Sequence, residues 1–144
     1  MTKSYGITDA EWNVMQVIWA RRQATAAEVI EELTPVTGWS HRTVRTLLGR
    51  LAEKGVLSAR QVGHRYVYKP AVSRQKCVRE ASNAFLDKIF AGDPAELLAH
   101  FVQDAELSAD EAAQLRALLE EKIKTAEAGS RKSAKRRSKK SKKH

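Results

Sequence analysis

The apolar residues of this 144-residue chain recur at helical rather than strand spacing over most of its length. The pattern is clearest between Ser40 and Leu57. The apolar positions there follow the i, i+3, i+4, i+7 spacing, and they are Val44, Leu47, Leu48 and Leu51. The opposite side has no carboxylate before Glu53, and it carries Arg42, Arg45, Thr46, Gly49 and Arg50. We therefore expect residues 40–54 to form a helix that buries one face in a core and offers a cationic face to a polyanion.

Two shorter helices are predicted before this basic helix. Thr8 and Glu11 have the spacing of a capping box, and so do Thr25 and Glu28. The first helix has an apolar face that we expect in the core, made of Trp12, Met15, Ile18 and Trp19. The second carries Val29, Ile30 and Leu33, and we expect Pro35 to end it. A short helix, a turn and the basic helix together make a helix-turn-helix pattern.

Ser40 is the natural N-cap of the basic helix, but Thr43 stands where a capping box would have glutamate. Without a carboxylate at that position, the free N–H groups and the helix dipole favour an approaching phosphate. The alternative is a plain serine cap with no further role. The sequence alone leaves both interpretations open.

After Gly55 the pattern changes to that of a β-hairpin. Val56–Gln61 and Tyr66–Lys69 are rich in strand-forming residues, and Pro70 closes the second strand. The tip carries Gly63, His64 and Arg65, and the stem carries Arg60. A polar, cationic hairpin after a basic helix is the pattern of a winged helix-turn-helix that binds DNA.

Three amphipathic helices are predicted between Ser73 and Lys124, with breaks at Gly92 and before Ser108. Their apolar faces are too extensive for three isolated helices to bury, so we expect a second copy of the chain to share the core. The predicted homodimer contacts are Val78, Phe85, Ile89, Leu97, Leu98, Phe101, Leu115, Leu118 and Leu119.

Charge is distributed unevenly along the chain, whose net charge is +9. Nine Lys and Arg residues and no acid follow Ser130, so the remaining chain has seventeen basic and seventeen acidic residues. Residues 36–70 have a net charge of +6, and residues 93–129 one of −6. We expect the tail to be disordered and to contact phosphate, because it has almost no apolar residue to bury.

The predicted fold class is mainly α, with three parts. Residues 1–72 form a winged helix-turn-helix DNA-binding domain with a two-stranded wing, and residues 73–125 form a helical dimerisation domain. Residues 126–144 form the disordered Lys/Arg-rich tail.

Other protein classes lack support in the sequence. The single cysteine, Cys77, excludes an intramolecular disulfide and any zinc site built on paired thiolates. The histidines show no catalytic or metal-ligand spacing, so we expect no enzyme, no cofactor and no metal. No apolar stretch reaches the length of a membrane span and no signal peptide is recognisable, which favours the cytoplasm.

The motifs together resemble the BlaI/MecI family of winged-helix repressors, the penicillinase repressors. The resemblance rests on Ile7–Trp12, Val14-Met15, Ile18-Trp19, Thr43–Leu48, Arg50-Leu51, Lys54-Gly55 and Tyr66–Tyr68. It implies a homodimeric repressor on a palindromic operator, with the third helix in the major groove of double-stranded DNA. With the cap and wing residues, the candidate DNA contacts are Ser40, His41, Arg42, Thr43, Arg45, Thr46, Arg50, Arg60, His64 and Arg65.

The resemblance also bears on induction. Family members of the antibiotic-resistance type are inactivated when a membrane sensor protease pathway leads to cleavage of an Asn-Phe bond. The matching place here is His100-Phe101, which keeps the phenylalanine and lacks the asparagine. The copper-responsive relatives have a cysteine-rich C-terminus, whereas this chain ends in lysines and histidine.

Two functions remain open at this point. The first is a sequence-specific repressor that reads base edges through the third helix. The second is an architectural, nucleoid-associated DNA-binding protein dominated by its basic tail. Winged helices that bind other proteins are a third and more distant class.

Overall fold

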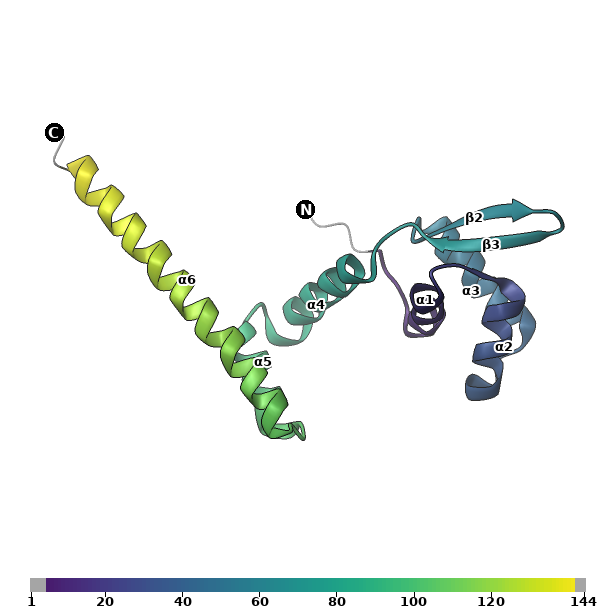
Figure 1. The fold of residues 1–144 in the computed structure, drawn as a ribbon, viewed down its shortest axis with the longest axis horizontal. Helices are drawn as coiled ribbons and strands as arrows, with labels where there is room; N and C mark the ends of the chain where they lie inside the picture. Colours follow the sequence, from purple (N-terminus) through teal and green to yellow (C-terminus); the bar gives the residue numbers. More distant parts are fainter. Residues whose placement is uncertain (1–4, 142–144) are drawn as a thin grey trace. The chain divides into compact units, whose positions relative to one another are not determined.

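The computed structural model describes residues 5–141, and the chain divides after Pro94 into two compact units. Figure 1 shows the elements in chain order. In the N-terminal unit they are α1 (Asp9–Arg21), β1 (Ala24–Thr25), α2 (Ala26–Thr37), α3 (His41–Glu53), β2 (Leu57–Val62), β3 (Arg65–Pro70) and α4 (Arg74–Phe90). The second unit contains α5 (Pro94–Asp104) and α6 (Ala109–Ser141). The mainly helical fold with an N-terminal winged helix-turn-helix is confirmed.

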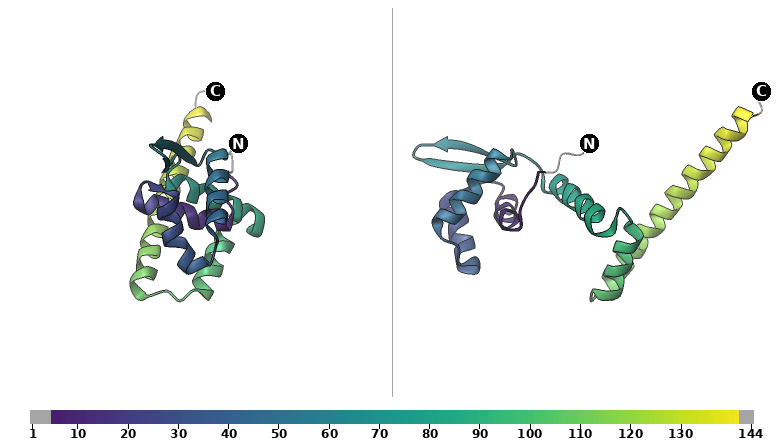
Figure 2. Two further views of the ribbon diagram at one scale, coloured as in Figure 1. Left: turned by 90° about the vertical axis from the view of Figure 1, so that its right-hand side faces the viewer. Right: turned by 180° about the vertical axis from the view of Figure 1, so that it is seen from behind.

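A core between α1, α2 and α3 holds the N-terminal unit together, and the three helices lie side by side in both views of Figure 2. Apolar residues of all three helices, and one residue after α3, have no solvent exposure. These residues are Val14, Met15, Ile18, Val29, Val44, Leu48, Leu51 and Val56. The predicted apolar face of α3 is therefore buried, as are Met15 and Ile18 of the predicted face of α1. Trp12 and Trp19 are half-buried against this core, with ring centroids 5.6 Å apart.

Both predicted capping boxes are present. The Thr8 N–H donates to Glu11 Oε1 at 2.8 Å, and the Glu11 N–H donates to Thr8 Oγ1 at 3.3 Å. The same reciprocal pair joins Thr25 and Glu28 at the start of α2. Each cap satisfies backbone donors that have no partner inside the helix.

The prediction that Pro35 ends the second helix is wrong, because α2 continues through Pro35 to Thr37. Proline has no N–H, so the Glu31 carbonyl cannot receive its usual backbone bond. Only two residues of the helix follow Pro35, and other contacts close this last turn. The Thr37 hydroxyl donates to the Leu33 carbonyl at 2.8 Å, and Gly38, in the left-handed region at φ 73°, donates its N–H to the Thr34 carbonyl at 2.9 Å.

The wing is a two-stranded hairpin, as predicted, but it belongs to a three-stranded antiparallel sheet in the order β1-β3-β2. The strand β1 was not expected, and its Ala24 pairs with Tyr68. The pairing of Val62 with Arg65 leaves a two-residue turn, Gly63-His64, in which Gly63 has φ 65°. The tip is therefore shorter than the sequence pattern indicated. The first strand has the predicted length but begins one residue later, and the second is extended by one residue at each end.

The start of α4 is attached to α1. The Trp19 indole N–H donates to the Val72 carbonyl at 3.1 Å, and Arg74 Nε lies 3.5 Å from Gln16 Oε1. Cys77, on the first turns of α4, is 2% exposed and is part of the core. The compact N-terminal unit therefore includes α4, and the domain boundaries at residues 72 and 125 stay predictions.

In the second unit, α6 is a helix of 33 residues that continues to Ser141. The sequence predicts disorder from residue 126. The described backbone is helical as far as Ser141, residues 142–144 lie outside the described part, and the disordered tail stays a prediction. Residues 126–137 are rich in Ala, Lys and Arg and include one Glu. All four residue types are strong helix formers. The part of the chain that the structure describes contains no helix long and apolar enough to cross a membrane.

Candidate nucleic-acid interface

The exposed face of α3 is held in place by its buried face. Val44, Leu47, Leu48 and Leu51 pack into the core, which fixes the rotation of the helix about its axis. The polar residues of the opposite side are consequently exposed together, and they are His41, Arg42, Thr43, Arg45, Thr46 and Arg50. All six are predicted DNA contacts, and the structure brings them onto one helix surface.

The arginines of this face are not engaged with acids. Among the described residues, no ion pair involves Arg42, Arg45 or Arg50. Arg21 gives the contrast, because it pairs with Glu28 at 3.0 Å and Glu32 at 2.8 Å. The α3 guanidinium groups therefore keep their donors for an external acceptor such as a phosphate oxygen or a guanine edge.

The N-terminus of α3 carries no acidic residue in its first turn. Ser40 Oγ accepts the Thr43 N–H at 3.1 Å and lies 3.0 Å from Thr43 Oγ1. The plain serine cap is thus present, and the partial positive charge of the helix end is not neutralised by a first-turn carboxylate. The phosphate contact at this helix end stays a prediction.

The Thr46 hydroxyl donates to the Arg42 carbonyl at 2.9 Å. Because its proton is used inside the helix, the oxygen can act only as an acceptor toward a ligand in this rotamer. In a major groove, the donors available to such an oxygen are the exocyclic amino groups of adenine and cytosine.

The C-terminus of α3 is attached to the first turn of α1 by contacts that sequence reasoning missed. Lys54 Nζ lies 2.5 Å from Glu11 Oε1 and donates to the Gly6 carbonyl at 2.7 Å. The Glu11 side chain is 1% exposed and that of Lys54 30%. Burial alone would raise the pKa of Glu11, but the hydrogen bonds from Lys54 and Thr8 outweigh it and lower the pKa.

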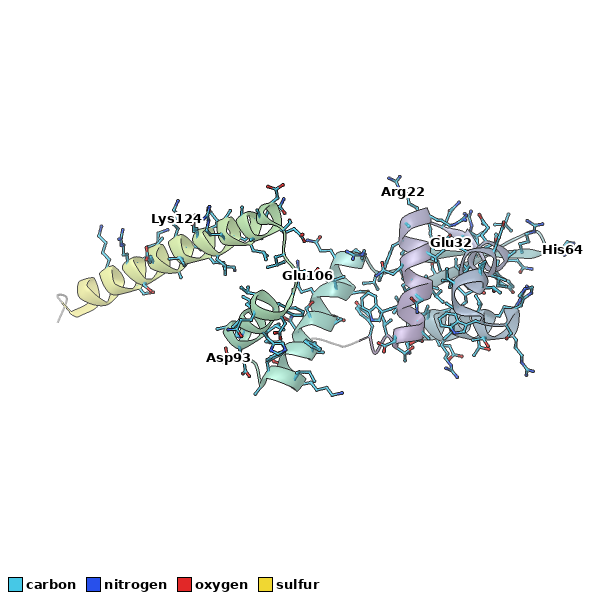
Figure 3. All side chains as sticks on the ribbon, turned by 90° about the horizontal axis from the view of Figure 1, so that it is seen from below. Arg22, Glu32, His64, Asp93, Glu106 and Lys124 are labelled. Atoms are coloured by element: carbon cyan, nitrogen blue, oxygen red, sulfur yellow. The ribbon has the colours of Figure 1, made fainter. Side chains whose placement is uncertain are left out.

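The wing places two of its predicted residues beside α3. A hollow of about 240 Å³ is lined by residues from the start of α2, from α3 and from the wing, namely Thr25, Ala26, Ala27, Arg45, His64, Arg65, Tyr66 and Tyr68. His64 lies at the outer end of the N-terminal unit in Figure 3. Arg45, His64 and Arg65 thus converge near the N-terminus of α2, whose first N–H groups have no partner within the helix.

Arg60 is not part of this hollow. It lines a separate hollow of about 170 Å³ with Gln23, Ser58, Val67 and Lys69. Lys69 and the two tyrosines of the first hollow are candidate contacts that the sequence analysis did not single out. The strand pattern could have indicated them, because residues two apart share one face of a strand. Tyr66 and Tyr68 share one face of β3, and Val67 and Lys69 share the other.

The predicted dimer contacts divide by exposure. Val78 and Leu97 are half-buried, whereas Phe101 is 55% and Leu118 65% exposed. The other exposed members of the set are Phe85, Ile89, Leu98, Leu115 and Leu119. Single exposed apolar residues are ordinary, so the exposure of this set is compatible with the predicted dimer, which stays a prediction.

The predicted cleavage site lies inside α5, with His100 Nε2 3.2 Å from Asp104 Oδ2. The bond from His100 to Phe101 is therefore helical in this structure. Over residues 5–141, no group of three or more His, Cys, Asp or Glu residues is placed to hold a metal ion. Burial raises the pKa of the Cys77 thiol, which disfavours the reactive thiolate.

The fold and this surface define a winged helix-turn-helix protein with a cationic recognition helix. The family profile described as penicillinase repressor matches residues 7–121. The chain belongs to this family, whose members are transcriptional repressors and not enzymes.

Two relatives, MecI and a penicillinase repressor, agree with this assignment. The methicillin resistance regulatory protein MecI of Staphylococcus aureus is 35% identical over 120 residues, which cover 83% of this chain and 98% of MecI. The penicillinase repressor of Bacillus licheniformis is 35% identical over 121 residues, covering 84% and 94%. A further match is the solution structure of monomeric B. licheniformis BlaI in complex with the blaP half-operator. The aligned residues are 39% identical in sequence and cover 53% of this chain and 93% of the BlaI chain, with a TM-score of 0.47.

Proposed function

We propose that this protein represses transcription by binding a palindromic promoter operator as a homodimer, with α3 of each copy in the major groove. The observation that carries the proposal is the outer face of α3. It offers three arginines that pair with no described acid, on a helix whose opposite side is locked in the core. Bound at a promoter in the cytoplasm, such a dimer would exclude RNA polymerase.

The residues of this surface have distinct proposed roles. Arg42 and Arg50 are suited to bidentate contacts with guanine, and Thr43 and Thr46 to single contacts with base edges. The remaining contacts are assigned to phosphate, through Ser40 and His41 at the start of α3, through Arg45, and through Arg60, His64 and Arg65 of the wing.

Dimerisation is proposed through α4, α5 and α6. Their apolar residues named above are exposed in the single chain, and a second copy would bury them. The resulting dimer would place its two α3 helices on the two halves of a palindrome. Cleavage at His100-Phe101 is the proposed route of induction, because it would divide the segment that holds the dimer together. Since that bond is helical, a protease requires local unfolding of α5.

The direct test of base reading is Arg50→Ala. Binding to the operator should weaken by about 1–3 kcal/mol, while binding to a scrambled duplex of equal length changes much less. Electrophoretic mobility shift with both duplexes measures this. Arg79→Ala, which removes one exposed charge from α4, is the matched control and should leave the operator preference intact.

A second candidate function is architectural DNA binding, favoured by the nine basic residues after Ser130. In that case Arg50→Ala would weaken binding to both duplexes equally, and no operator preference would exist in the unmodified chain.

A further inference from the structure

The C-terminal part of α6 extends beyond the region shared with the family. The family match ends at residue 121, and the alignment with MecI already covers 98% of that relative. In this chain α6 continues from there to Ser141. All nine charges after Ser130 are positive, whereas the rest of the chain has equal numbers of basic and acidic residues.

The basic residues of this extension follow a four-residue repeat. Pairs recur at Arg131-Lys132, Lys135-Arg136 and Lys139-Lys140, with Ser133-Ala134 and Arg137-Ser138 between them. A repeat of four residues returns to nearly the same side of a helix. The repeat therefore predicts one strongly cationic side and a side of mostly small residues.

Such a helix is poorly stabilised by its own residues. Like charges at i and i+4 repel each other, and the segment from Ser130 onward offers no acid to compensate. Arg131, Lys132 and Lys135 are exposed. An external polyanion would remove this repulsion, so the helical state should be favoured when one is bound.

We propose that residues 130–141 form a second DNA-binding element, which contacts backbone phosphates without reading the sequence and becomes more helical on binding. The proposal rests on the proposed function, because operator binding by α3 would bring the extension into the neighbourhood of the same DNA. Duplex DNA presents one negative charge per about 1.7 Å, which suits a closely spaced series of cations. A membrane surface suits it less, because a helix that lies in a membrane needs a large apolar face.

The test compares the full-length chain with a full-length neutralised variant, which combines Arg131→Gln, Lys132→Gln, Lys135→Gln, Arg136→Gln, Lys139→Gln and Lys140→Gln. Dissociation constants are measured for an operator duplex and a scrambled duplex over a range of salt concentrations. The plot of log affinity against log salt should become shallower by up to about 5 for the variant, since each phosphate contact contributes about 0.9. The ratio of operator to scrambled affinity should stay the same.

The matched control changes the small residues of the same segment. Ser130→Gln, Ser133→Gln, Ser138→Gln and Ser141→Gln together keep every charge and should leave the salt dependence unchanged. Circular dichroism gives an independent readout, since scrambled DNA should raise the helical signal of the unmodified chain and not that of the neutralised variant.

An unchanged salt dependence in the neutralised variant would overturn the proposal. So would tighter DNA binding by that variant, which would mean that the extension binds the acidic segment 93–129 instead. Loss of binding to anionic phospholipid vesicles with DNA binding unaffected would assign the extension to a membrane surface. If the unmodified chain has no operator preference, the proposed function fails, yet a shift in salt dependence would still establish the phosphate contacts of the extension.

Discussion

The two units of the chain differ in how they treat their apolar residues. In the N-terminal unit, α1, α2 and α3 bury most of theirs in one core, and the polar face of α3 is exposed. In the second unit, α5 and α6 have no buried residue among those whose burial the structure describes. The first unit therefore has a core of its own, whereas the exposed apolar residues of the second unit are ones for which we propose a partner chain.

Two leucine truncations test this difference between the units and should have the largest effect. Leu51 has no solvent exposure, so Leu51→Ala should lower the free energy of unfolding of the N-terminal unit by about 2–5 kcal/mol. Leu118 is 65% exposed, and Leu118→Ala should change that quantity by less than about 0.5 kcal/mol. Urea denaturation monitored by tryptophan fluorescence reports on the N-terminal unit, because all three tryptophans lie in it. Equal losses for the two variants would contradict the division.

The second prediction concerns association. Phe101→Asp places a charge on the proposed shared face and should weaken dimerisation by about 2 kcal/mol or more, which is at least about thirtyfold in the dissociation constant. Analytical ultracentrifugation over a concentration series measures it. Glu106→Ala, an exposed substitution in the loop between α5 and α6, is the control. A chain that is monomeric without any substitution would refute the dimer directly.

A smaller effect is expected at the contact that attaches α3 to α1. Glu11→Gln keeps an acceptor for the Thr8 N–H but removes the attraction to Lys54, and should lower stability by about 1–3 kcal/mol. Lys54 is partly exposed, so the loss should stay below that of a fully buried ion pair. Glu53→Gln, on the exposed side of α3, is the matched control.

This contact also sets a pH dependence. The folded-state pKa of Glu11 lies below its ordinary value of 4.5, so its stabilising contribution is complete above that pH and is lost as pH falls through the folded value. The difference in stability between the unmodified chain and Glu11→Gln should therefore be constant near neutral pH and shrink below about pH 4.5. A difference that grows on acidification would contradict the assignment.

Much of the N-terminal unit is predictable from the sequence, because its signals are local. The capping boxes at Thr8 and Thr25 and the spacing from Val44 to Leu51 each lie within one helix. Two local features were missed. The strand β1 is only two residues long, so it has no alternation of polar and apolar residues to detect. Pro35 does not end α2, because it lies in the last turn of the helix, where contacts of Thr37 and Gly38 close the turn.

Other features depend on residues far apart in the sequence. The contact between Glu11 and Lys54 joins positions 43 residues apart, so no local pattern contains it. The gathering of Arg45 with His64 and Arg65 likewise depends on how the wing folds back toward α3. For the C-terminal extension, low apolar content predicted disorder, while the helix formers that compose it are compatible with the helix observed to Ser141.

The most direct test of the account is a footprint of the full-length chain and of the neutralised variant on the promoter of its own gene. The central claim is that α3 reads the sequence and that the C-terminal extension adds only affinity. We expect both proteins to protect the same two symmetric half-sites, one or more helical turns apart, with the variant requiring a higher concentration. Uniform protection by the unmodified chain, or loss of the half-sites in the variant at every concentration, would contradict it.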